Sequence, residues 1–150
     1  MLKEGSKAPA FTLPDDEGKP VSLKDFKGKP VVLFFYPKDD TPGCTQEACD
    51  FRDNYTKFQK RGIAVLGLSK DKPAGKKKFK EKYGFPYPLL ADEDHAVLEA
   101  YGVWKEKNMY GKKVLGIERT TVVIDAEGKI KKVFPKVKIP GHVDEVLAVF

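Results

Sequence analysis

The sequence predicts an α/β fold in which a central mixed sheet is covered by helices on both faces. Residues 31–36 (VVLFFY) and 63–69 (IAVLGLS) are apolar runs without alternation, which is typical of strands buried on both faces. A helical pattern separates these runs, and the order strand, helix, strand predicts a right-handed crossover between parallel strands. Residues 119–134 (RTTVVIDAEGKIKKVF) predict an antiparallel hairpin that turns at Ala126-Glu127-Gly128.

Length and composition predict one packed domain over residues 1–150. Of the residues, 41% are hydrophobic and 33% are charged, a composition that favours a packed hydrophobic core over disorder. No stretch approaches the ~18 consecutive apolar residues that a membrane-spanning helix needs. The amino terminus lacks the apolar run of a secretory signal. We therefore expect a cytoplasmic protein with no membrane partner.

The elements before the middle of the chain follow from turn signals and periodicity. Residues 11–23 predict two short strands around an Asp-Asp-Glu-Gly turn, an N-terminal β-hairpin. Residues 25–30 predict a turn or a single helical turn. A helix is predicted over 45–60, ended by Gly62, because apolar side chains recur there at helical spacing.

The later elements complete the expected topology. A helix over 76–83 ends at Gly84, and Leu89-Leu90 predicts a short strand. Asp94 is the expected cap of a helix over 95–102. The last helix starts near His142, with its apolar residues on one side. Parallel strands followed by a hairpin and a final helix are the order of a thioredoxin-like fold.

The net charge of +6 raises the question of a nucleic-acid partner. The lysines cluster in residues 70–84 and 128–138. In the first cluster Phe79 and Tyr83 lie four apart on one helix face, and in the second we expect Ile130 to point inward. We interpret both clusters as solvated faces, so no nucleic-acid partner is expected.

Cys44 and Cys49 are the only cysteines, with four residues between them. The familiar redox pair has two residues between its cysteines. In a reducing compartment such a pair is more often catalytic, metal-binding or buried than a permanent disulfide. A metal site is the weakest of these, because structural zinc usually takes four protein ligands and His95 and His142 are distant in sequence.

Cys44 is expected at the start of the helix that follows the first buried strand. Free backbone N–H groups and the helix dipole stabilise a thiolate there. Thr41 lies three residues upstream, and its hydroxyl can donate to the sulfur or to a bound oxygen. Pro37 and Pro42 stiffen the connecting loop. The sequence thus predicts an anion-binding cup with a nucleophilic sulfur at its base.

A peroxide is the substrate class that suits this sulfur. Attack of a thiolate on an O–O bond forms a sulfenic acid directly. A carbonyl substrate usually needs a histidine to move protons, and only a folding back of His95 or His142 could supply one. Arg119, at the start of the predicted hairpin, is the candidate cation for the developing charge.

Cys49 is a candidate second thiol that needs a conformational change. In an unbroken helix, residues five apart have Cα atoms roughly 8–9 Å apart. A disulfide requires about 4.4–6.8 Å, so a bond between Cys44 and Cys49 demands unwinding of the helix start. The alternative is that Cys49 only packs under the helix. Glu47 is either a partner of the helix dipole or a group that orients others near the sulfur.

Residues 34–53 (FFYPKDDTPGCTQEACDFRD) closely resemble the peroxiredoxins, specifically the Q-type group also called bacterioferritin comigratory proteins. LGLSKDKP, FPYPLLAD and ERTTVVIDAEGKI extend this resemblance over nearly the whole chain. The resemblance implies a thioredoxin fold, hydroperoxide reduction, and recycling by thioredoxin or a related dithiol donor. No metal, haem or flavin cofactor is expected. A monomer is favoured, with a weak dimer as the alternative.

The resemblance also implies roles for five residues. Cys44 matches the peroxidatic cysteine and Cys49 the resolving cysteine. Pro37 and Thr41 match the loop partners of the peroxidatic cysteine, and Arg119 matches the family arginine.

The chain departs from the group at one visible position. Where the group often has Ser-x-x-x-His-x-x-Phe, this chain has lysine in place of the histidine, three residues before Phe79. We interpret that segment as peripheral to the sulfur.

Two other functions compete with the peroxidase. A disulfide reductase of the cytochrome-maturation kind has an opening similar to residues 8–23. It needs, however, two cysteines with two residues between them and an export signal or membrane anchor. Insulin reduction would reveal it. A basic binding or holdase protein would bind nucleic acid in a salt-sensitive way and consume no peroxide.

Overall fold

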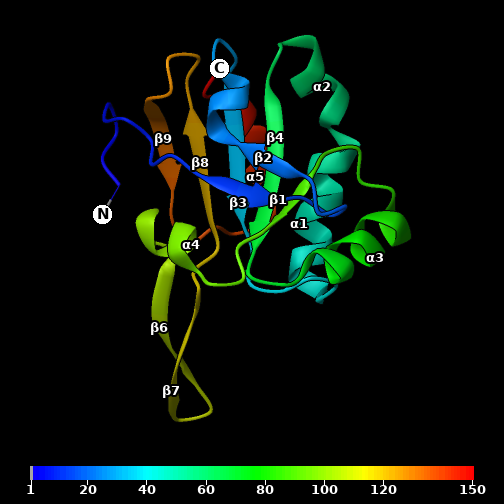
Figure 1. Cartoon of the computed structure of the whole chain (residues 1–150), viewed down its shortest axis with the longest axis vertical. Helices are drawn as coiled ribbons and strands as arrows, with labels where there is room; N and C mark the ends of the chain where they lie inside the picture. Colours follow the sequence, from blue (N-terminus) through cyan, green and yellow to red (C-terminus); the bar gives the residue numbers. More distant parts are fainter. Residues whose placement is uncertain (1) are drawn as a thin grey trace.

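A mixed sheet of five strands forms the centre of the molecule (Figure 1). The computed structural model describes residues 2–150. The strands lie in the order β5–β4–β3–β8–β9; β3, β4 and β5 are parallel, and β8 and β9 run antiparallel to their neighbours. Their bounds are β3 (Val31–Phe35), β4 (Ala64–Ser69), β5 (Leu89–Ala91), β8 (Thr120–Ile124) and β9 (Ile130–Phe134). The predicted crossover and hairpin are both confirmed.

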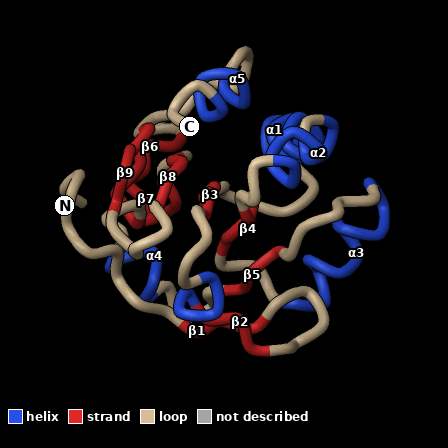
Figure 2. The backbone as a smooth tube through the Cα atoms, turned by 90° about the horizontal axis from the view of Figure 1, so that it is seen from above, coloured by secondary structure: helices blue, strands red, loops and turns tan. Residues whose placement is uncertain are grey.

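Helices cover both faces of this sheet, as the view from above makes clear (Figure 2). One face carries α1 (Pro42–Asp53), α2 (Tyr55–Lys60) and α5 (His142–Leu147). The other carries α4 (Ala96–Ala100), the predicted hairpin of β1 (Thr12–Pro14) with β2 (Pro20–Ser22), and a 3-10 turn (Leu23–Phe26). Helix α3 (Pro73–Tyr83) lies beside β5. The predicted thioredoxin-like α/β fold is confirmed.

Strand β3 divides its side chains between two cores. Val32 and Phe34 belong to the cluster under α1, α2 and α5, whereas Leu33 and Phe35 belong to the cluster on the α4 side. All five residues of β3 are buried. A strand enclosed on both faces needs no polar alternation, which is why the apolar run at residues 31–36 identified it.

The helix predicted over 45–60 is two helices in the structure. Helix α1 begins earlier, at Pro42, because proline suits the first helical position, where no N–H partner is needed. The break falls at Asn54, whose side-chain amide donates to the Asp50 carbonyl at 2.8 Å. This side-chain bond competes with the continuing backbone ladder, and α2 starts at the next residue.

Two further helix boundaries differ from the prediction. Helix α3 starts at Pro73 and not at residue 76, and it ends at Gly84, which has the expected left-handed conformation (φ 67°). Helix α4 is shorter than predicted and its N-cap is His95 (φ 53°). The Asp94 carboxylate nevertheless accepts the Ala96 N–H at 3.1 Å, so it does bond to the start of the helix. In residues 2–150 no helix combines the length and apolar character needed to span a membrane.

A second hairpin, which the sequence did not predict, projects from the body (Figure 1). It pairs β6 (Trp104–Met109) with β7 (Lys112–Ile117). Tyr110 and Gly111 form its turn, both with positive φ. Such two-residue turns are usually recognised in a sequence from Asn or Asp before glycine. Here a tyrosine precedes the glycine, so the sequence does not indicate the turn. The strands are also largely exposed and lack apolar alternation.

The interpretation of the lysine clusters was right for one and wrong at one position of the other. In β9, Ile130 is buried while Lys131 and Lys132 are exposed. In α3, however, Lys76 is completely buried together with Phe79. The segment containing Lys76 is therefore not a peripheral surface.

Candidate functional site

Cys44 is the third residue of α1, in the first turn after the end of β3. Its side chain is buried, and the loop that delivers it covers residues 36–41, called here the Cys44 loop. Thr41 precedes the helix in extended conformation (φ −98°, ψ 154°), and Pro42 occupies the first helical position. The sulfur therefore lies in the turn where backbone N–H groups lack helical partners, as the sequence predicts.

Arg119 joins β7 to β8 and points its guanidinium at the sulfur. One terminal nitrogen (Nη2) donates to Cys44 Sγ at 3.3 Å, and the other (Nη1) donates to Glu47 Oε1 at 2.7 Å. Its side chain is only 18% exposed. Burial lowers the pKa of Arg119, but the facing Glu47 and Cys44 more than offset this, and the net direction is upward. The guanidinium is a cation held in place by two acceptors, the Glu47 carboxyl group and the Cys44 sulfur.

Because Gly43 has no Cβ atom, the Arg119 guanidinium can lie close to the first turn of α1. A Cβ atom at this position would lie 3.2 Å from Arg119 Nη2 and 3.5 Å from Ile139 Cδ1. The first of these contacts is tight enough to displace the guanidinium.

Glu47 orients Arg119, so of the two roles left open by the sequence the structure favours the orienting one. It is one helical turn after Cys44 and 1% exposed. Burial raises the pKa of Glu47 to about 7, although the Arg119 charge opposes the shift. Its Oε2 has no hydrogen-bond partner within residues 2–150. A buried carboxylate with one free oxygen depends on Arg119 for most of its stabilisation.

Thr41 and Pro37 lie in the Cys44 loop, but Thr41 does not donate to the sulfur here. Its hydroxyl donates to the Lys38 carbonyl at 2.9 Å. A donation from Thr41 to a ligand would require the hydroxyl to rotate. Pro37 directly follows Tyr36 and is half-buried at the start of the loop.

Cys49 is on the same unbroken helix as Cys44, and both thiols are free. It is half-buried and lines a hollow of about 390 Å³. Burial raises the pKa of Cys49, with a smaller opposing effect from Arg52. The thiol is therefore held protonated, the less nucleophilic form. The hollow is lined by Asp40, Pro42, Thr45, Gln46, Cys49, Lys82 and Tyr83.

The histidines do not join Cys44. His142 bonds to Thr121 Oγ1 and to Glu145 Oε1, both at 2.6 Å, and burial lowers its pKa. His95 stacks on Trp104 with ring centroids 4.4 Å apart. Within residues 2–150 there is also no group of three or more His, Cys, Asp or Glu side chains able to hold a metal ion.

Two lysines near the sulfur were missed by sequence reasoning. A thiolate at Cys44 would raise the pKa of both Lys76 and Lys107, although burial lowers each more strongly. Lys107 belongs to the unpredicted hairpin, so nothing in the sequence placed it near Cys44. The sequence did mark Lys76, because it occupies the position where the Q-type group often has histidine.

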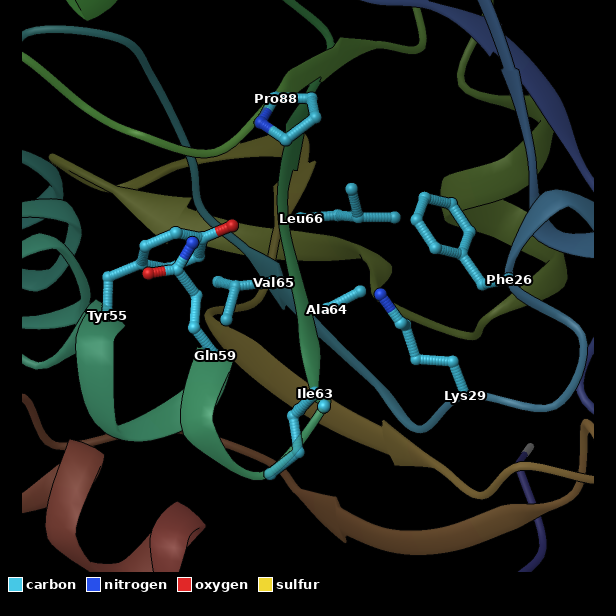
Figure 3. Close-up of a pocket in the computed structure, with 10 residues that line it drawn as sticks. Phe26, Lys29, Tyr55, Gln59, Ile63, Ala64, Val65, Leu66 and Pro88 are labelled. Atoms are coloured by element: carbon cyan, nitrogen blue, oxygen red, sulfur yellow. The ribbon is translucent and has the colours of Figure 1, made fainter.

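A separate hollow of about 300 Å³ lies elsewhere on the molecule (Figure 3). Tyr55 and Gln59 of α2 flank β4 on one side, and Phe26 and Lys29 flank it on the other. It contains none of the predicted site residues. It lies at the start of β4, whereas Cys44 follows the end of β3, the parallel neighbour of β4.

Comparison with known proteins assigns the family. Residues 5–133 match the AhpC/TSA family. A Coxiella burnetii protein named among the Bcp peroxiredoxins is 58% identical over 146 residues, covering 97% of both chains. Peroxiredoxin Bcp of Bacillus subtilis is 50% identical, covering 97% of this chain and 93% of that protein.

Solved structures agree with the sequence relatives. The bacterioferritin comigratory protein of Xanthomonas campestris superposes with a TM-score of 0.91 at 42% identity, covering 97% of this chain and 96% of that one. A mutant of the Xylella fastidiosa protein PrxQ gives a TM-score of 0.93 at 35% identity, covering 99% of this chain and 94% of that one. The chain belongs to the AhpC/TSA family and is a peroxiredoxin of the Bcp, or Q-type, group.

Proposed function

We propose that this peroxiredoxin reduces hydrogen peroxide and organic hydroperoxides with Cys44 as the attacking thiolate. The sulfur attacks the terminal oxygen of the hydroperoxide, the O–O bond breaks, and Cys44 becomes a sulfenic acid. The other oxygen leaves as an alkoxide or hydroxide and takes up a proton to form an alcohol or water. The observation that carries this proposal is the Arg119 fork, with one N–H on Cys44 Sγ at 3.3 Å and one on Glu47 at 2.7 Å.

Arg119 acts on both the ground state and the transition state. Its charge favours the thiolate, and the same guanidinium is positioned for negative charge that develops on the peroxide oxygens. Glu47 keeps the fork aimed at the sulfur. Thr41, once its hydroxyl turns from Lys38, is the nearby donor for a peroxide oxygen, and Pro37 restricts the loop that carries it.

Cys49 then resolves the sulfenic acid. Its thiolate attacks the Cys44 sulfur, the S–O bond breaks, and the oxygen leaves as water after protonation. Because both residues lie on one helix, residues 42–49 must unwind before a disulfide forms. Unwinding also exposes Cys49 to water, which relieves the burial that keeps its thiol protonated.

A dithiol donor such as thioredoxin reopens the disulfide in this cycle. The donor oxidises its own two thiols and returns Cys44 and Cys49 to the reduced state. Organic hydroperoxides are included as substrates because the Xanthomonas campestris relative was studied for alkyl peroxide reduction.

Two cysteine variants test the proposal. Cys44→Ser should abolish peroxide consumption, since serine is not ionised at neutral pH. Cys49→Ser should complete one stoichiometric turnover and then fail to cycle with thioredoxin. Stopped-flow consumption of hydrogen peroxide, with and without the reductant, measures both. A Cys44→Ser protein that keeps the wild-type rate would refute the proposal.

A further inference from the structure

Helix α3 directs one lysine into the protein interior. Lys76 has a side chain that is 0% exposed, and it is the only buried lysine within residues 2–150. A buried ammonium without partners is strongly destabilising. Hydrogen-bond acceptors or negative charges around it must therefore offset the cost of removing its charge from water. The compensation comes from three side chains outside α3, which makes the interaction a link between separate parts of the chain.

The hydrogen bonds around Lys76 favour its protonated form. Its Nζ contacts Tyr36 OH at 3.1 Å, Asp39 Oδ1 at 3.2 Å and the Ser69 hydroxyl at short range. The Tyr36 hydroxyl already donates to Asp39 Oδ1 at 2.5 Å, and the Ser69 hydroxyl donates to Asp71 Oδ2 at 3.0 Å. All three contacts of Lys76 are therefore acceptors. An ammonium has three donors and no acceptor, so this arrangement fits the charged form.

These contacts hold the Cys44 loop against α3. Tyr36 and Asp39 belong to the loop, and the Asp39 N–H also donates to Asp71 Oδ2 at 2.8 Å. Asp40, the next residue, is held in a left-handed conformation (φ 55°) by bonds from Lys82 and Tyr83, also on α3. A non-glycine residue keeps such a conformation only where its surroundings impose it. Helix α3 thus determines the path of the chain into α1.

Lys76 also interacts with the sulfur through its charge. Burial lowers the pKa of Lys76, while Asp39, Asp71 and a Cys44 thiolate all raise it. A Coulombic interaction acts equally on both partners, so the ammonium that is stabilised by the thiolate stabilises the thiolate in return.

We propose that Lys76 is a positioning residue for Cys44: its buried ammonium anchors the Cys44 loop through Asp39 and acts with Arg119 to favour the thiolate. This inference rests on the proposed peroxidase function. It extends that function to α3, a helix that makes no hydrogen bond to the sulfur within residues 2–150.

Several charged and polar groups influence Cys44 and Lys76, and each variant below changes one of them while the others stay in place. The groups that influence Cys44 come from α1, β6, the β7–β8 connection and α3. Those that influence Lys76 come from the Cys44 loop, the end of β4 and the residues just after it. They are Glu47, Lys107, Arg119 and Lys76 for Cys44, and Tyr36, Asp39, Ser69 and Asp71 for Lys76.

The first variant is Lys76→Met, which preserves most of the side-chain volume and removes the charge. The pH at which peroxide consumption is half-maximal should rise by about half to one unit, equivalent to a three- to tenfold slower reaction below that midpoint. The rate at high pH should recover, because the thiolate forms there without help. Single-turnover stopped-flow from about pH 5 to pH 9 measures the profile. Lys77→Met, on the exposed side of α3, is the matched control and should not move it.

The second variant, Asp39→Asn, predicts a shift of opposite sign. The asparagine Oδ1 can still accept from Lys76 and Tyr36, so the loop keeps its bonds. Asp71 still raises the pKa of Lys76, and the Tyr36 and Ser69 oxygens still accept from its Nζ, so Lys76 keeps its proton. Without the negative charge of Asp39 this ammonium is less compensated and favours the thiolate. The midpoint should therefore fall. A merely structural network would lose rate in both variants without shifting the midpoint in opposite directions.

Unchanged midpoints in both variants, or shifts of the same sign, would overturn the role of Lys76. If Lys76→Met does not fold, as judged by circular dichroism, Asp39→Asn decides alone: a midpoint at or above that of the wild type overturns the inference. Wild-type consumption that does not depend on Cys44 would instead refute the proposed function itself, so the two failures are distinguishable.

Discussion

The Arg119 side chain lies between two groups that need its charge, the Cys44 sulfur and the Glu47 carboxylate. Glu47 has no other ionic partner in the described chain, and its pKa of about 7 reflects that burial exceeds the stabilisation that Arg119 supplies. The guanidinium therefore has two competing roles. When Glu47 is protonated, more of the Arg119 charge is available to the sulfur.

Glu47 predicts a pH dependence of stability with an unusual sign. Its pKa is raised from 4.5 to about 7 on folding, so the folded protein holds this proton more tightly than the unfolded chain. Stability must then fall as the pH rises from about 4.5 through about 7, by about 3 kcal/mol for a shift of this size. Glu47→Gln cannot titrate and should lack this loss.

Urea unfolding at several pH values measures the effect. The free energy of unfolding of Glu47→Gln, relative to the wild type, should increase steadily across that window. A relative stability that stays constant with pH would mean that Glu47 is ionised in the folded protein throughout, with a pKa near its ordinary value.

Residue types and spacing located the candidate residues Cys44, Thr41 and Arg119 without a structure. They did not identify what each side chain bonds to. Thr41 donates to Lys38 and not to the sulfur, because a main-chain acceptor three residues away is within its reach. Lys76 was misjudged, because its burial depends on acceptors from the Cys44 loop and the end of β4.

At the scale of the helix, α1 carries both cysteines and must break for them to meet. Its first turn has proline and glycine at the first two positions, Pro42 and Gly43. On its exposed side the Gln46 Nε2 donates to Asp50 Oδ1 at 2.8 Å, a single solvent-exposed bond across one helical turn. Local unfolding of such a segment requires much less free energy than global unfolding.

Helix propensity at position 46 should control the resolving step. Gln46→Gly and Gln46→Ala remove the same side-chain bond, but glycine is less favourable in a helix than alanine by about 1 kcal/mol. If unwinding limits disulfide formation, the glycine variant should form the Cys44–Cys49 disulfide roughly fivefold faster than the alanine variant. Their rates of sulfenic acid formation should agree.

Rapid-quench alkylation after peroxide addition separates these two steps. Equal rates of disulfide formation in the two variants would show that α1 unwinding does not limit resolution.

Elements with strong local signals were predicted correctly, and those without them were not. The run at residues 31–36 and the turn at residues 126–128 identify their strands from the sequence. The β6–β7 hairpin was missed because Lys105, Glu106 and Lys107 show no apolar alternation and Tyr110 takes a left-handed conformation that tyrosine seldom adopts.

At the scale of the whole molecule, the sheet brings distant segments to one site. Cys44 follows the end of β3, Arg119 immediately precedes β8, and Lys76 lies on the helix after β4. Strands β8 and β4 are the two neighbours of β3, so all three segments meet at one end of the sheet. The sequence placed Arg119 only at the start of the predicted hairpin; the strand order that brings it to Cys44, and the contact itself, required the three-dimensional structure.

The β6–β7 hairpin should be dispensable for folding. Large apolar side chains project from it into solvent, with Tyr110 100% exposed and Leu115 61% exposed. Lys105 and Gly116 are paired across it, so an Asn-Gly turn can replace residues 106–115. This deletion should change the free energy of unfolding by less than about 1 kcal/mol.

Ile117→Ala, at the buried base of β7, is the contrasting variant. Ile117 is 2% exposed and packs in the core on the α4 side, so its truncation should destabilise the protein by about 2–4 kcal/mol. Chemical denaturation compares the two variants. A deletion as damaging as Ile117→Ala would show that the hairpin stabilises the sheet.

The most direct test is mass spectrometry of the native, reduced protein after one equivalent of hydrogen peroxide. We expect a loss of two hydrogens, with Cys44 and Cys49 joined in one linked peptide. The same treatment of Cys49→Ser should leave one added oxygen on Cys44. A wild-type protein that retains an added oxygen on Cys44 while Cys49 stays free, or that does not react at Cys44, would contradict the account.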